Sequence, residues 1–471
     1  MKTVSSAPSL PNPTPILFLI TAIALLLWPD AVGMTALVVA GAIAIPIAMV
    51  GMMKSPLVAI ATLLAASAMP RIFIEIGGLK ARPEHIVGGV MLCLVPLFRR
   101  KRERPVEWIT PDYWLFGYIA LIFVSSVLMS IEPKQTTKWA VQQALGIVPY
   151  FILRVLITDR ERFRWAFRAL LAVGAAASAY AILCFYSYTF FGTALGVEVE
   201  QYEGGVAATY GVQFEANILG AYSGALAVMM LVMYLWEGRR RYLIGCSFFG
   251  LIGMAISLSR AALIATLMAV ALAALTAFIW KRLTWKAAVN FAAASLVALL
   301  LVAPFILRHY TERFSTVELS DPMSDSNTLT RAVQTVSAVD EIMKHPIFGG
   351  GTASFQLVFY WEALGTDWEN QGWIGNTELR VLHDTGAVGL LTFVIFLGSL
   401  VWQAIKTLKR ETSPELIALL AGGAVYCVTF QATEGTLLAF SWVHVGLIGC
   451  AVAIMGRQEK QGNEIGELAS S

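Results

Sequence analysis

The stretch NTELRVLHDTGAVGLLTFVIFL, residues 376–397, places four ionisable side chains directly before a run that carries no charge. The ionisable residues are Glu378, Arg380, His383 and Asp384. The uncharged run continues to residue 405, which is long enough for a helix to cross the ~30 Å hydrocarbon core of a bilayer. The stretch therefore predicts a membrane helix with a cluster of polar groups at its entrance.

The composition of the whole chain agrees with this stretch. Of the 471 residues, 57% are hydrophobic and 14% are charged, against about 25% charged residues in an ordinary soluble domain. Apolar windows of roughly 17 to 25 residues recur along the chain, each the length of one membrane-crossing helix, and they lack the alternation of a β-barrel. We therefore predict an all-α fold, a polytopic transmembrane helix bundle of about 12 to 14 spans.

Clusters of Lys and Arg separate the apolar windows and mark the cytoplasmic side, because basic loops stay in the cytoplasm. Each interval between clusters has room for one helical hairpin, so all the clusters and both termini can lie inside. The basic clusters are residues 99–104, 159–164, 237–241, 281–286, 406–410 and 456–460. The predicted spans are 113–130, 139–157, 165–192, 213–236, 242–258, 261–280, 287–307, 381–405, 416–433 and 436–455, with about four shorter ones within 14–98.

The predicted spans divide the chain into five segments. They are N-terminal membrane helices at 1–98, central membrane helices at 99–307, a long outer loop at 308–380, C-terminal membrane helices at 381–456 and a cytoplasmic tail at 457–471. We call the outer loop the lid, because most connections are a few residues long and a longer one is usually functional. The first apolar run lacks a clear small-residue cleavage site, so we expect an uncleaved first helix.

Arg260 interrupts a long apolar stretch, since residues 242–280 contain no other charge. A charge near the membrane interior is costly and usually faces a cavity and a partner. The hairpin topology places Arg260 at an outer turn. Two interpretations stay open there: an anion-binding arginine in a cavity open to the outer face, and an interfacial arginine that reaches the headgroups.

Arg331 lies in the lid, in the sequence NTLTRAVQTVSAVDEIMKHPIFGGG. From Thr330 the apolar spacing predicts an amphipathic helix of about four turns that ends before His345. Arg331 would lie in its first turn, where the helix dipole favours negative partners. An anionic ligand and a plain surface arginine both fit this position. The glycines at 349–351 permit close backbone approach or form a flexible turn.

We expect mainly structural roles for the remaining polar residues and for the cysteines. Glu434 would lie at the outer turn of the final hairpin, either as a satisfied carboxylate or orienting an arginine or a base. The acidic stretch at 196–205 lacks metal-loop spacing. All five cysteines fall inside apolar runs without CxxC spacing, so neither disulfides nor a metal site is expected.

The spacing around the opening stretch resembles the signature of a known family. Asn376 is followed by nine residues and then by Gly386-x-x-Gly389, after a long outer loop and at the start of a membrane helix. This arrangement resembles the O-antigen ligase and polymerase superfamily, and the similarity extends over roughly 110–455. Three further elements are similar to that family in the same order: YGVQFEANILGAYSGALAV at 210–228, ISLSRAALIATLMAV at 256–270 and RAVQTVSAVDEIMKHPIFGGGTASF at 331–355.

The resemblance implies both a fold and an activity. It implies about a dozen membrane helices with a periplasmic lid, in a multi-pass protein of the bacterial inner membrane whose active face is periplasmic. It also implies transfer of a glycan from an undecaprenyl-diphosphate carrier to an acceptor hydroxyl, without a cofactor or metal. The expected partners are the lipid-linked glycan, a glycan or lipid-linked acceptor, and membrane lipid, with no nucleic acid.

The resemblance also implies roles for individual residues. Arg260 and Arg331 match the family's arginines, and a guanidinium suits a leaving diphosphate because it offers a fixed fork of donors. Asn217 matches the family's asparagine, which would hydrogen-bond the carrier or a sugar; a contact between helices is an equal alternative. Asn376 belongs to the signature itself and is expected to bind substrate.

The sequence departs from the family's ligases at one position. Those ligases carry His immediately before the signature Asn, whereas this chain has Gly375. On a helix, Glu378 lies about 60° around from position 375, and His383 lies about 80° around and some 12 Å further along the axis. Glu378 is either the catalytic base or a solvated residue at the helix start. His383 is either an oriented catalytic imidazole or an interface pair with Asp384.

Gly375 argues against ligase activity onto a lipopolysaccharide core and favours a polymerase-type or otherwise divergent member of the superfamily. Two alternatives to a transferase remain. The first is a transporter of lipid-linked oligosaccharides, which would be expected to show internal repeats. The second is a family member that binds the carrier without catalysing transfer.

Overall fold

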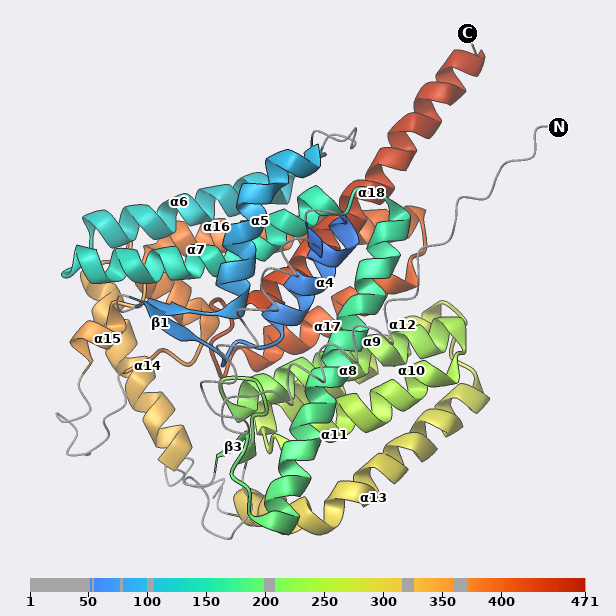
Figure 1. The fold of residues 1–471 in the computed structure, drawn as a ribbon, viewed down its shortest axis with the longest axis horizontal. Coiled ribbons are helices and arrows are strands. Elements are labelled where there is room, and N and C mark those ends of the chain that lie inside the picture. Colours follow the sequence, from blue (N-terminus) through green and yellow to red (C-terminus); the bar gives the residue numbers. More distant parts are fainter. Residues whose placement is uncertain are drawn as a thin grey trace.

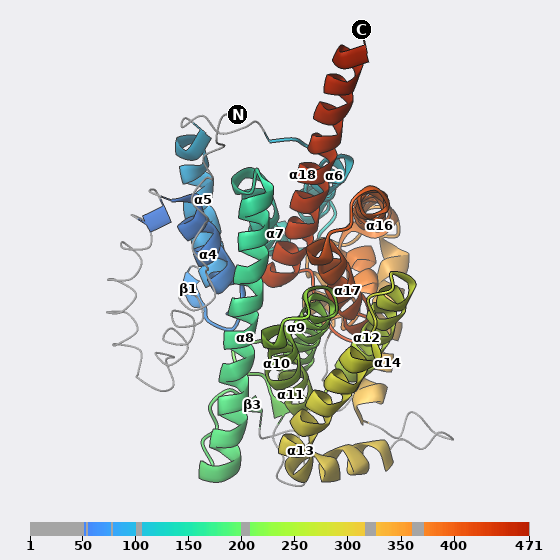
Figure 2. The same ribbon diagram turned by 90° about the vertical axis from the view of Figure 1, so that its right-hand side faces the viewer.

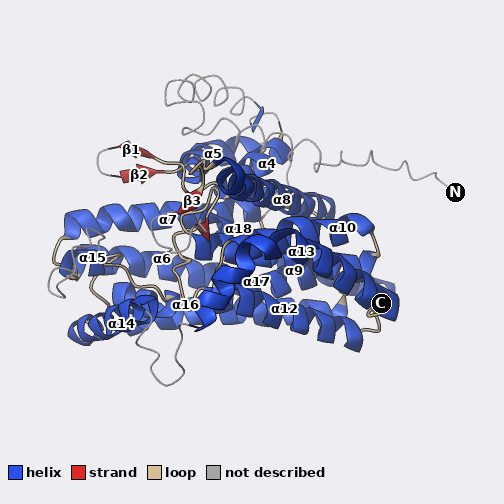
Figure 3. Cartoon of the chain, turned by 90° about the horizontal axis from the view of Figure 1, so that it is seen from below, coloured by secondary structure: helices blue, strands red, loops and turns tan. Residues whose placement is uncertain are grey.

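The computed structural model describes residues 51–52, 55–76, 79–99, 106–198, 208–315, 326–359 and 372–470. Over these residues the chain is mainly helical, with two short antiparallel strand pairs (Figures 1 and 3). The spans predicted before residue 51 lie outside the described residues. Most of the basic cluster at 99–104 and most of the acidic stretch at 196–205 also lie outside them.

Helices account for most of the described residues. Their bounds are α4 (Pro56–Ser67), α5 (Pro83–Arg99), α6 (Thr110–Leu128), α7 (Pro133–Leu156), α8 (Arg160–Phe191), α9 (Ala216–Glu237), α10 (Arg240–Ile244), the π-helix η1 (Gly245–Leu251), α11 (Ile252–Ile256), α12 (Arg260–Ile279), α13 (Trp285–Ser315), α14 (Ser326–Lys344), α15 (Phe355–Val358), α16 (Thr377–Arg410), α17 (Pro414–Thr429) and α18 (Ala439–Ser470). The strands are β1 (Ile74–Ile76) paired with β2 (Leu79–Ala81), and β3 (Val197–Glu198) paired with β4 (Ala208–Thr209).

Eight helices of the described chain are long and apolar enough to cross a membrane: α6, α7, α8, α9, α12, residues 285–307 of α13, α16, and residues 439–457 of α18. Three shorter apolar helices accompany them, within α4, α5 and α17. The helical, membrane-spanning class is therefore confirmed. The predicted count of 12 to 14 spans and the periplasmic position of the lid stay predictions.

Polar side chains at the predicted turns explain where several helices begin. Asp159, Ser259 and Ser413 each accept a hydrogen bond from the backbone N–H three residues later, at the starts of α8, α12 and α17. Such caps satisfy N–H groups that have no partner within the helix. Helix α8 consequently begins inside the basic cluster at 159–164, and α17 begins four residues after the cluster at 406–410.

Helix α9 forms the centre of the bundle. Within its span, 94% of the residues are buried inside the protein, against 17% for the peripheral α13. It packs against α12 and α17, and small residues make the close approach possible. A Cβ atom added at Gly220 would lie 2.6 Å from the Cβ of Ala262.

The predicted span 242–258 is not a single regular helix. It consists of α10, the π-helix η1 and α11 in direct succession. The π-helix packs against α9, where a Cβ atom at Gly250 would lie 2.6 Å from the Cα of Ala227. Insertions of this kind are frequent at functional sites, and the apolar sequence does not signal them.

The lid forms a small layer at one end of α6, α7 and α16, where α14 and α15 lie (Figures 1 and 3). Helix α14 begins at Ser326, four residues before the predicted start at Thr330. Arg331 therefore lies in the second turn of this helix, and its predicted place in the first turn is wrong. The predicted end before His345 is confirmed, because α14 ends at Lys344. At the opposite end of the molecule α18 extends beyond the bundle (Figure 2).

Candidate active site

The membrane helix of the opening stretch is broken at the signature glycine. Gly386 has φ 68° and ψ −172°, so α16 consists of two helical pieces that meet there. The break would leave backbone groups of residues 383–388 without helical partners, and buried backbone groups require partners. The lid supplies them through four hydrogen bonds: Gly350 N–H to His383 O (2.9 Å), Gly351 N–H to Asp384 O (3.1 Å), Ala387 N–H to Pro346 O (2.9 Å) and Val388 N–H to Ile347 O (3.2 Å).

This docking requires glycine on both sides. Gly349 has φ 74°, and a Cβ atom there would lie 2.5 Å from the carbonyl carbon of Asp384. A side chain at Gly386 would collide with the backbone of Ile347. Of the two interpretations of glycines 349–351, the structure supports close backbone approach.

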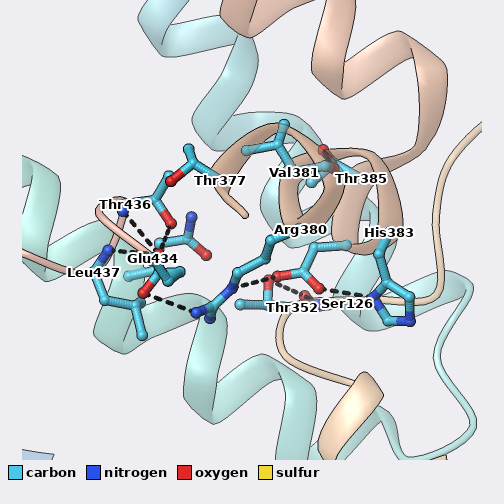
Figure 4. Close-up of polar contacts among 12 residues, drawn as sticks. Ser126, Thr352, Thr377, Arg380, Val381, His383, Thr385, Glu434, Thr436 and Leu437 are labelled. Atoms are coloured by element: carbon cyan, nitrogen blue, oxygen red, sulfur yellow. Dashed lines mark hydrogen bonds and ion pairs between the residues drawn. The ribbon is translucent and has the colours of Figure 1, made fainter. Parts of the chain in front are cut away.

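Two further bonds hold the docked loop against α6: Ser126 Oγ donates to Thr352 Oγ1 at 2.8 Å (Figure 4), and Thr352 N–H donates to Ser126 Oγ at 3.0 Å. Ser125 Oγ of α6 also donates to the Asp384 carbonyl of α16 at 2.6 Å. The lid also has a small apolar cluster of its own, in which Phe355 and Phe359 pack with Ala338 of α14. These contacts fix α14, and therefore Arg331, relative to the start of α16.

A line of buried ionisable groups crosses the start of α16 (Figure 4). Arg380 Nη1 lies 2.9 Å from Glu434 Oε2, and Arg380 Nε lies 3.4 Å from Asp384 Oδ2. Asp384 Oδ1 lies 3.0 Å from His383 Nδ1. All four side chains are buried. The side chains therefore follow one another in the order Glu434, Arg380, Asp384 and His383, from the turn before α18 to the docked lid loop.

Glu434 is held in place by its own turn. One of its carboxylate oxygens accepts hydrogen bonds from the Thr436 hydroxyl, from Thr436 N–H at 2.7 Å and from Leu437 N–H at 3.1 Å. Its other oxygen pairs with Arg380. Both interpretations of Glu434 thus apply, because it is a satisfied carboxylate that also orients an arginine.

Arg82 extends this charged line on the far side of Glu434. Its Nη1 donates to the Leu437 carbonyl at 3.0 Å, and its guanidinium lies 4.4 Å from the centre of the Phe214 ring. Burial lowers the pKa of Arg82, while the nearby carboxylates of Glu84 and Glu434 act in the opposite direction. The Nε atom of Arg82 is buried and has no hydrogen-bond partner in the described structure.

A hollow of about 400 Å³ opens beside the start of α16. Polar groups from three segments line it: Arg331 from α14, Asn376 and Glu378 from the start of α16, and Gln431 from the turn after α17. Leu382 and Leu390 contribute apolar surface. We call this space the first hollow; it brings together three of the predicted site residues.

The polar residues of the first hollow are bonded to one another or to its walls. Asn376 caps α16, since its Oδ1 accepts from Leu379 N–H at 2.8 Å, and its Nδ2 donates to Gln431 Oε1 at 3.1 Å. Gln431 Nε2 donates to Glu378 Oε1 at 2.7 Å. Arg331 Nη1 donates to the Ala432 carbonyl. The wall of the hollow is therefore a connected polar network.

A second hollow, of about 230 Å³, lies beside the first. Its polar lining comprises Arg82, Glu215, Thr433 and Glu434, and the indole of Trp373 also faces it. Residues 373 and 375 line different hollows, as do residues 431 and 433. The segments 373–376 and 431–434 therefore form the wall between the two spaces.

Three predicted site residues lie elsewhere. Arg260 is the first residue of α12 and is half-buried, and Asn217 lies half-buried in the first turn of α9. His383 is buried beneath the docked lid loop, with its ring 5.5 Å from that of Phe355. These residues are not among those that line either hollow in the described structure. Their predicted roles stay predictions.

The match to a known family covers this region of the chain. Residues 245–394 match the model of the O-antigen ligase family. Over these residues the chain carries an O-antigen ligase domain, which supports membership of the O-antigen ligase and polymerase superfamily. No curated protein matches it. The matched segment runs from η1 into α16 and contains Arg260, Arg331 and Asn376, whereas Asn217 and Glu434 lie outside it.

The domain match and the fold together support a general function. The eight long apolar helices of the described residues indicate a multi-pass membrane protein. The O-antigen ligase domain supports an enzyme of the ligase or polymerase kind, with a lipid-linked glycan and an acceptor as partners in general. The described residues contain no group of three or more His, Cys, Asp or Glu side chains that could hold a metal ion, and the expectation of metal-free chemistry stays a prediction.

Sequence reasoning assigned no role to two arginines of this site. Arg380 carries a local signal, since it lies four residues before Asp384 on a helix and such pairs face one another. Arg82 carries no such signal, because its hydrogen-bond partner Leu437 lies 355 residues away in the sequence.

Proposed function

We propose that the protein transfers a glycan from an undecaprenyl-diphosphate carrier to an acceptor hydroxyl at the periplasmic face of the bacterial inner membrane. The observation that carries the proposal is the first hollow, where a lid arginine faces a carboxylate at the start of a membrane helix. The arginine suits the leaving group, and the carboxylate suits the attacking hydroxyl. The O-antigen ligase domain supplies the reaction class.

The leaving group would be bound by Arg331. As the bond between the anomeric carbon and the phosphate oxygen breaks, negative charge develops on the diphosphate, and fixed guanidinium donors stabilise that charge. The hydrogen bond from Arg331 to the Ala432 carbonyl and the packing of α14 support its fixed position. Arg260 would supply a second cation from the start of α12.

The acceptor hydroxyl would be activated by Glu378. Its oxygen attacks the anomeric carbon, its proton passes to the Glu378 carboxylate, and the carrier diphosphate departs with the electrons of the broken bond. Glu378 lines the first hollow and is held by Gln431 at 2.7 Å. These contacts favour Glu378 over His383, whose Nδ1 is engaged by Asp384 beneath the lid.

The two asparagines would act on substrate from different positions. Asn376 lines the first hollow, but its amide also caps α16 and holds Gln431. We therefore expect Asn376 to shape the pocket as well as to bind the sugar. Asn217 would hydrogen-bond the carrier or the glycan from the start of α9.

The glycine at position 375 supports a second candidate function. Gly375 provides no side chain at the position where the family's ligases carry a histidine, so the protein could bind the carrier while a partner supplies the chemistry. A transporter of lipid-linked oligosaccharides is the remaining alternative.

Reconstitution separates these functions. The purified protein in liposomes would be given a radiolabelled undecaprenyl-diphosphate oligosaccharide. Release of diphosphate carrier with lengthening of the glycan supports polymerase activity, and transfer to another acceptor supports ligase activity. Movement across the membrane without bond cleavage would contradict the proposal and support a transporter, and binding alone would support a non-catalytic member.

A further inference from the structure

The second hollow has a lining that differs in chemistry from that of the first. One side carries the hydroxyl of Thr433 and the carboxylate of Glu215, which are hydrogen-bonded to each other. Trp373 offers an indole, and Leu437 and Leu438 supply apolar surface. A pocket with a few convergent polar groups and an apolar remainder is the usual form of a small-molecule site.

The charges of this hollow disfavour a diphosphate. Two carboxylates, Glu215 and Glu434, face it together with one arginine, Arg82. Glu434 pairs with Arg380 from outside the hollow, and Arg82 lies 3.9 Å from the carboxylate of Glu84, so Arg82 gives the hollow no excess of positive charge. A neutral, hydroxyl-rich ligand therefore fits this space better than an anion.

Arg82 points to a ligand independently. Its side chain is only 5% exposed, yet its Nε atom has no hydrogen-bond partner in the described structure. A buried donor without a partner is costly, and a ligand hydroxyl in the hollow would accept its hydrogen bond. An indole face beside such donors is suited to the C–H face of a sugar ring, because the ring system is large, flat and apolar.

The size and position of the second hollow fit one sugar residue at the end of a glycan. Its volume of about 230 Å³ is below the roughly 300–1,000 Å³ of sites that enclose a drug-sized ligand. The wall toward the first hollow is thin at Gly375. A Cβ atom placed there would lie 3.5 Å from the Trp373 ring and 3.7 Å from Arg331 Nη1, so the indole and the guanidinium both belong to this part of the wall.

We infer that the second hollow is the acceptor subsite, which binds a neutral terminal sugar of the acceptor glycan against Trp373. This inference rests on the proposed transfer reaction and names the substrate of its second half. The acceptor hydroxyl would reach across the wall at residues 373–376 to the anomeric carbon of the donor in the first hollow.

The test measures sugar binding and transfer separately on the full-length protein. The binding probe is a soluble repeat-unit oligosaccharide released from the surface polysaccharide of the source bacterium, observed by saturation-transfer NMR on purified protein in detergent. Trp373→Ala is expected to weaken binding by about tenfold, and Trp373→Phe to retain most of it. Trp285→Ala is the matched control, since Trp285 is 84% exposed at the start of α13.

The kinetic readout uses the radiolabelled lipid-linked donor with varied acceptor. Trp373→Ala should raise the apparent KM for the acceptor and leave the KM for the donor unchanged. Failure of the wild-type protein to bind the oligosaccharide, or equal binding by Trp373→Ala, would overturn the acceptor subsite even if transfer occurs. Trp373-dependent binding without any transfer would leave the subsite standing and would refute the proposed reaction.

Discussion

Arg380 and Glu434 form a buried ion pair, with 2.9 Å between Nη1 and Oε2, that ties the start of α16 to the turn before α18. Glu434 lines the second hollow, and Arg380 continues to Asp384 and His383 under the lid. The pair therefore links the wall of one candidate subsite to the docking place of the lid. Loss of this ion pair would affect both the wall of the second hollow and the docking of the lid.

Removing either partner of this pair should be strongly destabilising. Glu434→Gln removes one of the two carboxylates that pair with the buried Arg380, and Arg380→Met leaves the buried carboxylates of Glu434 and Asp384 without their cation. Breaking a buried ion pair in this way costs about 3–5 kcal/mol. Thermal unfolding in detergent, followed by size-exclusion chromatography, should show a lowered Tm for each single variant. The double variant Arg380→Met with Glu434→Gln should recover part of the loss. A double variant whose loss equals the sum of the two single losses would show that the pair is not coupled.

Gly386→Ala should release the lid. The added Cβ atom collides with the Ile347 backbone, and φ 68° is unfavourable for alanine. Hydrogen exchange at the amides of Gly350 and Gly351 should therefore become faster, because both donate across this junction. Gly398→Ala in the same helix is the control, since nothing lies within 4 Å of its added Cβ atom. Equal protection in both variants would contradict the docking role of Gly386.

Gly375→His should fold like the wild-type protein and raise the transfer rate. A Cβ atom at this position meets only ordinary contacts, at 3.5 Å and 3.7 Å, and the imidazole would supply a base beside Arg331. An exposed imidazole has a pKa of about 6.5, so the gain should appear as pH rises through that value and the ring loses its proton. Gly375→Ala is the control with the same Cβ atom and no base. Equal transfer rates of Gly375→His and Gly375→Ala across this pH range would contradict the prediction.

Glu378→Gln should cost more activity than stability, whereas His383→Ala should do the reverse. Glu378 is exposed in the first hollow, and loss of a general base lowers the rate by about 10²–10⁴-fold. His383 is buried against Asp384 and Phe355, so its removal should lower the Tm first. The check is kcat and Tm measured on both variants. A larger loss of kcat for His383→Ala at unchanged Tm would move the catalytic role to the imidazole.

Much of the helical framework could be predicted from the sequence, because a membrane helix carries its signal locally. The long uncharged runs gave spans close to α9, α12 and α16, and the helix of the lid ended where the proline after His345 predicted. The start of α14 was predicted late because residues 326–330 are polar apart from Leu329, so they show no repeated apolar spacing. The π-helix η1 also escaped prediction, since its residues are as apolar as those of a regular helix.

The site could be predicted only in part. The family resemblance located Asn376 and Arg331, and helix geometry from Gly375 pointed to Glu378; the three residues line one hollow. The break at Gly386 could not be foreseen, because it depends on hydrogen bonds from the lid. Arg82 was missed for a related reason. Its role arises from contacts between segments at opposite ends of the sequence, and no local pattern encodes them.

In the proposed reaction, Arg331 of the lid stabilises the departing diphosphate in the first hollow. The most direct test is release of undecaprenyl diphosphate from the radiolabelled donor by Arg331→Ala in liposomes, with Arg260→Ala as the second predicted arginine. Lys344→Ala is the matched control, because Lys344 is an exposed cation on the same helix. We predict that each arginine variant inserts normally and loses activity by on the order of 10²-fold or more, while Lys344→Ala keeps it. Full turnover by both arginine variants would contradict the account.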